Sequence, residues 1–199
     1  MDSTPRGRAI IIVTQSELAN EAEQFKSIFT QLLFETEVYS LITCDEIQIK
    51  LTQLANTNEY NGNAFIMMFI GNGYNENIIG YREPNDTQWP PENHNLLPIS
   101  DIVATFAWTR APVLRDKIKV FIFNCDRLRY GSWCNLVGGP IGYVTHFGQT
   151  FSHTIAQYSS YKSLIEMFVM TLNRMEDELT ERRLWQLPEI NMFETTKDF

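Results

Sequence analysis

The sequence is poor in cysteine, and the few cysteines it has argue against two kinds of stabilising site. It contains three among 199 residues, an odd number with no CxxC pair: Cys44, Cys125 and Cys134. Secreted domains held by disulfides use an even number, and zinc sites need thiols or histidines at short spacings that this chain lacks. We therefore expect free thiols, a cytoplasmic location, no metal ion and no cofactor.

Long apolar segments and a surplus of positive charge are also missing. The longest strongly apolar run is residues 64–70, whereas a membrane-spanning helix needs about 20 such residues. The early apolar run, residues 9–13, is shorter than the core of a secretory signal, which has roughly 7–15 residues. The 16 Lys and Arg against 24 Asp and Glu give a net charge of −8, which disfavours contact with nucleic-acid phosphates. We expect neither a membrane nor a nucleic acid as partner.

What is present is an alternation of strand and helix patterns. The apolar share of 44% and the aromatic share of 13% are sufficient for one globular core. Short β-branched runs predict strands, and apolar residues at spacings of three and four predict helices. The predicted strands are residues 8–13, 38–42, 64–70, 78–81, 117–124, 141–147 and 189–193. The predicted helices run from Leu18 to Leu32, after a cap at Thr43 or Asp45, over residues 99–106, and from about Ser159 past Met175.

This alternation predicts an α/β fold, in which helices cover both faces of a mostly parallel sheet of about six strands. In such sheets, functional groups lie in the loops at the carboxyl ends of the strands. The loops after Ile70 and Phe123 are the candidates here. The first contains Asn72-Gly73, a dipeptide typical of a tight turn, and its glycine spacing does not fit a dinucleotide-binding loop.

The residues around these two loops resemble the caspase family of cysteine proteases. Ile70-Gly71-Asn72-Gly73, with the short strand after it, is similar to the family's third strand and its His-Gly turn. Asn124-Cys125-Asp126-Arg127 resembles the Gln-Ala-Cys-Arg-Gly that ends the fourth strand, about 50 residues after the catalytic His. The resemblance runs from Arg8 to Phe199. It implies a three-layer caspase-like sandwich in a single domain, residues 1–199, with a large-subunit part of about 1–130, a small-subunit part of about 138–199 and no prodomain.

The resemblance also implies that the catalytic pair has been replaced. Asn72 stands at the position of the catalytic His, and Asp126 at that of the catalytic Cys. An amide cannot exchange a proton near neutral pH, and a carboxylate is not a nucleophile for an unactivated peptide bond. Cys125 stands one residue early, so a strand would turn its side chain to the other face. Cys125 is then either an inert buried thiol or a displaced nucleophile with His146 or His153 as its base.

Other parts of the family's machinery are altered as well. The loop after the first strand is reduced to residues 14–16 and has no Arg. The family's Ser-Trp-Arg segment corresponds to Ser152, His153 and Thr154, a remnant of the substrate pocket without its Arg. A substrate carboxylate would lack its bidentate partner. No Asp occurs between Arg127 and Glu176, so the cut after Asp that activates caspases is not expected.

Together, these changes predict an inactive caspase homologue rather than an enzyme. The implied partner is an active caspase, which the chain would activate or inhibit as a decoy, in apoptosis or innate immunity. The implied interface is the family's dimer strand, here Glu189, Ile190, Asn191, Met192 and Phe193. Two alternatives stay open: a residual cysteine endopeptidase that uses Cys125, and a homodimeric scaffold or binding module.

Overall fold

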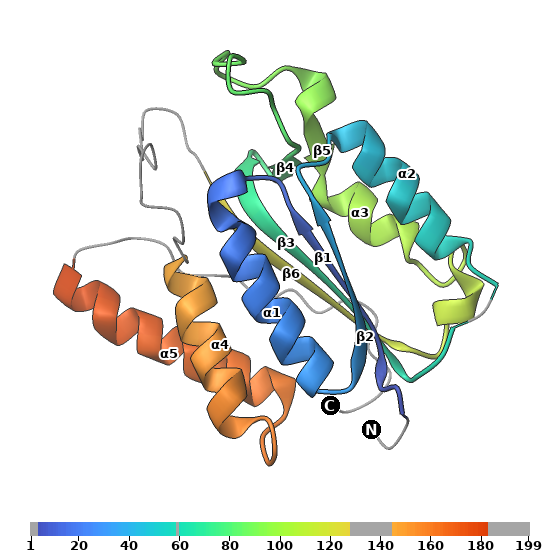
Figure 1. Ribbon diagram of the computed structural model, residues 1–199, viewed down its shortest axis with the longest axis vertical. Coiled ribbons are helices and arrows are strands. Elements are labelled where there is room, and N and C mark those ends of the chain that lie inside the picture. The colour runs from blue at the N-terminus through green and yellow to red at the C-terminus, as the bar shows by residue number, and fades with distance from the viewer. Residues whose placement is uncertain (1–3, 59, 128–144, 183–199) are drawn as a thin grey trace. The chain divides into compact units, whose positions relative to one another are not determined.

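The chain forms two compact units, residues 1–143 and 144–199. The computed structural model describes residues 4–58, 60–127 and 145–182. The first unit holds the sheet and the helices around it, drawn from blue to yellow in Figure 1, and the second holds two helices, drawn in orange and red. No helix in the described part of the chain is both long and apolar enough to cross a membrane.

The first unit is built on a six-stranded sheet (Figure 1). Its strands are β1 (Gly7–Val13), β2 (Phe34–Ser40), β3 (Ala64–Tyr74), β4 (Asn77–Ile79), β5 (Leu96–Pro98) and β6 (Ile118–Arg127). The four long strands lie parallel in the order β2-β1-β3-β6, whereas β4 is antiparallel to both β3 and β5. The sheet is therefore mixed, which corrects the expectation of a mostly parallel one. The connection between β3 and β4 is too short for the crossover that parallel strands need.

The turn between β3 and β4 lies beyond the place that the sequence predicts. Asn72-Gly73 is not a turn but part of β3, where Asn72 is opposite Asp126 of β6. The turn is formed instead by Asn75 and Glu76, whose φ angles are 46° and 59°. Two successive left-handed residues make a hairpin turn whose twist matches that of its strands. Pairing with the long strand β6 extends β3 past the dipeptide.

Helices cover both faces of this sheet. α2 (Cys44–Ala55) and α3 (Ile99–Thr105) lie on one face. There they enclose an apolar cluster whose buried members include Ile10, Ile12, Ile47, Leu51, Phe65, Met67, Phe69, Ile102 and Phe106. α1 (Ala19–Gln31) lies on the other face, with Phe25 and Phe29 buried. Because both faces are covered, residues 64–71 of β3 are all buried, as a continuous apolar run predicts.

The start of α2 follows directly from its sequence. The Thr43 side chain accepts a hydrogen bond from the Glu46 amide at 3.4 Å, and the Glu46 carboxylate accepts one from the Thr43 amide at 2.8 Å. This reciprocal pair satisfies two of the amides that a helix leaves unpaired at its N-terminus. Of the two predicted caps, Thr43 is therefore confirmed and Asp45 lies inside the helix.

The second unit consists of α4 (His146–Tyr158) and α5 (Leu164–Arg182). The helices contact each other through aromatic rings, with the centroids of Phe147 and Phe168 5.7 Å apart and those of Phe151 and Phe168 5.6 Å apart. These ring contacts bury apolar surface between the two helices.

Two sequence predictions in this unit are corrected. The predicted strand 141–147 is wrong at His146 and Phe147, which begin α4 because the Thr145 side chain caps the helix by accepting from the Gly148 amide at 2.9 Å. The long helix predicted from about Ser159 begins at Leu164, since Ser159 ends α4. Residues 141–144 of the first predicted strand and the whole predicted strand 189–193 lie outside the described residues.

Leu33 provides a test of the backbone geometry at the end of α1. Its φ angle is 66° and its side chain is 49% exposed. A left-handed Leu costs roughly 1 kcal/mol more than Gly. Leu33→Gly is expected to raise the free energy of unfolding by about 0.5–1 kcal/mol in urea titrations relative to Leu33→Ala, which keeps the Cβ. A glycine variant less stable than the alanine variant would contradict this geometry.

Candidate functional site at the carboxyl ends of β3 and β6

Parallel pairing brings the ends of β3 and β6 side by side. In the β3–β6 register, Asn72 is the Cα partner of Asp126. Asn72 is also the single residue of β3 that is half-buried rather than buried, so its side chain is accessible at the end of an otherwise enclosed strand. The two positions singled out in the sequence are therefore neighbours, at the edge of the sheet where a parallel α/β fold places its functional groups.

Cys125 lies at the same edge of the sheet, but its side chain faces the layer of α2 and α3, away from the face on which Asn72 lies. Its Cα partner is Gly71, one position before Asn72, and its half-buried side chain packs against the apolar cluster of α2 and α3. Successive side chains of a strand point to opposite faces of the sheet. The preceding residue illustrates this, because the Asn124 side chain donates to the buried Glu21 carboxylate of α1 at 2.5 Å. The thiol of Cys125 and the amide of Asn72 therefore lie on opposite faces.

An open cavity of about 320 Å³ adjoins Asn72. It forms because β3 is longer than β1, which ends opposite Ile70, where the Thr14 amide donates to the Ile70 carbonyl at 3.1 Å. Beyond that point the hairpin strand β4 pairs with β3. The cavity is lined by residues 14–17 after β1, by Leu41 after β2, by Asn72, and by several residues between 79 and 89.

The wall of the cavity depends on a close backbone approach at Gly80. A Cβ at this position would lie 2.5 Å from the Cys44 amide nitrogen and 2.9 Å from its sulfur. Glycine therefore lets the segment after β4 contact the start of α2. Cys44 itself is buried, and burial raises the pKa of its thiol to about 11, so it is not a thiolate nucleophile at neutral pH.

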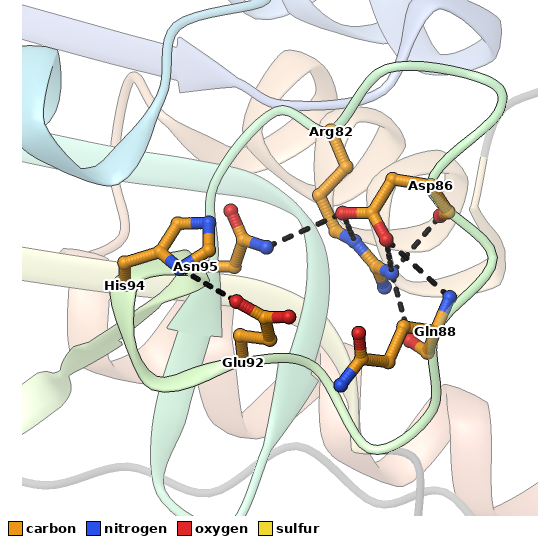
Figure 2. A network of polar contacts seen from close by, with 6 residues as sticks. All are labelled: Arg82, Asp86, Gln88, Glu92, His94 and Asn95. Atoms are coloured by element: carbon orange, nitrogen blue, oxygen red, sulfur yellow. Dashed lines mark hydrogen bonds and ion pairs between the residues drawn. The ribbon is translucent and has the colours of Figure 1, made fainter.

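The loop after β4 is held by Arg82, a residue that the sequence analysis did not select. Figure 2 shows its guanidinium between the Asp86 carboxylate and two backbone carbonyls. Nε and Nη2 donate to the two Asp86 carboxylate oxygens at 2.9 and 2.7 Å, and Nη2 also donates to the carbonyls of Asp86 and Gln88 at 2.9 and 2.7 Å. The side chain is only 15% exposed. The charge of Arg82 is thus neutralised inside its own loop.

The other residues of Figure 2 complete this loop. The Asn95 side chain donates to the Asp86 carboxylate at 3.3 Å, and the exposed His94 lies 3.2 Å from Glu92. The Arg82 hydrogen bonds lower the pKa of Asp86 to about 2. The only sign of this pair in the sequence is an Arg followed four residues later by an Asp in a Pro-rich stretch. Such a stretch has no helical or strand periodicity, so the spacing alone does not predict an ion pair.

The remaining predicted site residues belong to the second unit or lie outside the described residues. Ser152, His153 and Thr154 lie within α4 in the second unit, with His153 exposed. The hydroxyl groups of Ser152 and Thr154 each donate at 2.9 Å to a carbonyl of the same helix. The predicted dimer strand 189–193 is outside the described residues. Among residues 4–58, 60–127 and 145–182, no three His, Cys, Asp or Glu side chains are placed to hold a metal ion.

The Arg82–Asp86 pair predicts a specific pH dependence. Because the pKa of Asp86 is lowered in the folded protein, its contribution to stability is present above the unfolded value of 3.8 and is lost as the pH falls toward 2. A carboxyl ¹³C NMR titration is expected to give a pKa of about 2 for Asp86 in the native protein and a higher pKa in Arg82→Gln, because the largest cause of the lowering is removed. Equal Asp86 values in both proteins would contradict the pairing.

Comparison with known protein families identifies the family of the first unit. A model of the caspase domain matches residues 6–138, a segment that contains β1 to β6 and every residue that lines the cavity. No curated protein matches the sequence. Since the matched segment is well over half of the sequence, the chain belongs to the caspase-domain family.

Proposed function

We propose that this chain is a catalytically inactive member of the caspase family that regulates an active caspase by binding to it. The observation that carries the proposal is the register of β3 and β6, in which Asn72 is opposite Asp126. By resemblance, these are the positions of the family's catalytic His and Cys. An amide and a carboxylate therefore occupy the place where a base and a thiol are needed.

The chemistry of peptide hydrolysis supports this assignment. A cysteine protease needs a thiolate next to an imidazole that protonates the leaving amine. The carboxamide of Asn72 has no ionisation near neutral pH and cannot replace the imidazole. Cys125 does not replace the missing nucleophile beside Asn72, because its side chain packs on the opposite face of the sheet.

The surroundings of Asn72 also differ from a site that holds a substrate Asp. Such a site requires a guanidinium that is available to the carboxylate of the substrate. In the cavity beside Asn72, the guanidinium of Arg82 is already bound by Asp86 and two carbonyls. The loop after β1, residues 14–16, has no Arg. Loss of the catalytic pair and of the specificity group together favours a protein that has kept the fold for association.

The proposed mode of association is strand pairing. By resemblance, residues 189–193 are the strand that pairs with its counterpart in a second caspase molecule. A strand with an unpaired edge binds another strand through its backbone groups, and a two-fold interface uses the same surface on both partners. Binding of this kind either orders the loops of the active partner or occupies the surface it needs for its own dimer. The proposed location is the cytoplasm, where the thiols stay reduced.

The proposal predicts the outcome of a titration. The purified chain is added to an active caspase from the same source, with a fluorogenic Asp substrate. We expect a dose-dependent rise or fall in the rate, no turnover by the chain alone, and an unchanged effect for Cys125→Ala. The double variant Ile190→Asp with Met192→Asp is expected to weaken the effect at least about tenfold, because it places charges in an apolar interface.

A matched control distinguishes a damaged interface from a general effect of replacing an apolar residue by Asp. Ile49 on α2 is 57% exposed, and Ile49→Asp makes the same chemical change outside residues 189–193. This variant is expected to keep the full effect on the caspase. Thiol-dependent turnover by the chain alone that disappears in Cys125→Ala would show a residual endopeptidase instead. Self-association without any effect on the caspase would show a scaffold.

A further inference from the structure

The cavity beside Asn72 has a negatively charged lining, whereas a pocket that binds acidic side chains needs a positive one. It is lined by one basic residue, Arg82, and by three acidic residues, Glu17, Glu83 and Asp86. Arg82 and Asp86 cancel each other's charge, since two of the four hydrogen bonds from the guanidinium go to the Asp86 carboxylate, and the side chain of Arg82 is 15% exposed. The net charge of the lining therefore comes from Glu17 and Glu83.

These two carboxylates are available to a ligand. Glu17 and Glu83 are exposed, and neither has an ion-pair partner among the residues that the structure describes. They reach the cavity from two separate segments, Glu17 from the turn after β1 and Glu83 from the loop after β4. A cationic group between them would have a carboxylate from each segment, whereas an anion would meet both with no guanidinium to compensate.

The apolar part of the lining is suited to a long cationic side chain. Trp89 lies in the lining, remains 40% exposed, and is positioned by an edge contact with Tyr74, with ring centroids 5.3 Å apart at an angle of 77°. Leu41 is 38% exposed in the same lining. An exposed Trp face attracts a cation, and an exposed Leu covers the methylene groups that carry it. A volume of about 320 Å³ is at the lower end for ligand pockets and is suited to one or two side chains.

We propose that this cavity binds a basic side chain of a peptide, an arginine in preference to a lysine, with Glu17 and Glu83 as its ionic partners and Trp89 as its stacking surface. Arginine is favoured because a guanidinium is planar, stacks on an indole and pairs with more than one carboxylate at a time. The site is independent of the loss of catalysis, since it uses neither Asn72 nor position 126 as a reactive group. The proposed ligand of this cavity is therefore a basic segment of a peptide.

The binding of short peptides to the native protein tests the proposal. Three acetylated and amidated tripeptides, Ala-X-Ala with arginine, citrulline or aspartate at X, are titrated into the ¹⁵N-labelled chain at low salt. The arginine peptide is expected to shift the resonances of Trp89, Leu41 and residues 79–83 in a saturable way. The citrulline peptide, which has the same shape without the charge, is expected to bind about five- to tenfold more weakly. The aspartate peptide is expected not to bind.

Variants locate the binding to the cavity. Glu17→Gln with Glu83→Gln is expected to weaken arginine-peptide binding about five- to tenfold. Glu23→Gln with Asp116→Asn removes the same charge from two exposed residues that do not line the cavity, and is expected to change binding less than twofold. Equal losses in the two double variants, or shifts spread over the acidic surface, would overturn the proposal in favour of non-specific attraction. Equal or tighter binding of the aspartate or citrulline peptide would overturn it as well.

Discussion

The parallel pairing of β3 with β6 is the constraint on which the rest of the structure depends. Its register fixes which residues meet at the carboxyl edge, and a shift of one residue would place Cys125 rather than Asp126 opposite Asn72. The register is itself supported by the core, since Phe69 of β3 and Phe123 of β6 both face the cluster of α2 and α3 and their rings stack 5.4 Å apart. Apolar packing several residues away therefore determines which residues lie opposite each other at the site.

The same strand explains why a cavity exists beside the site. β3 extends beyond the end of β1. Its last residues pair with β4, which leads into the loop that carries Arg82. Arg82 ties that loop together by binding the Asp86 carboxylate and two backbone carbonyls. A guanidinium used for this purpose is not available to a substrate. The geometry that stabilises the loop therefore also leaves the cavity acidic.

The elements governed by short-range patterns could be predicted, and those governed by pairing or loop contacts could not. The apolar run of residues 64–70 and the cap at Thr43 act locally, so β3 and α2 follow from the sequence. Asn72-Gly73 has the composition of a turn, but pairing with β6 keeps it extended. α4 was missed because residues 141–147 have the β-branched and aromatic composition of a strand, whereas the cap at Thr145 starts a helix. The Arg82–Asp86 pair joins two loop residues without periodicity, so only the structure identifies it.

The most direct measurement restores the two missing groups and records thiol reactivity. Asn72→His and Asp126→Cys are introduced together with Cys125→Ala and Cys134→Ala, and iodoacetamide alkylation is followed at pH 6. If position 72 faces position 126 as the family's base faces its nucleophile, the imidazole lowers the thiol pKa and alkylation is at least about tenfold faster than in the same protein with Asn72 retained. Equal rates would contradict the register and, with it, the interpretation of Asn72 and Asp126 as the replaced catalytic pair.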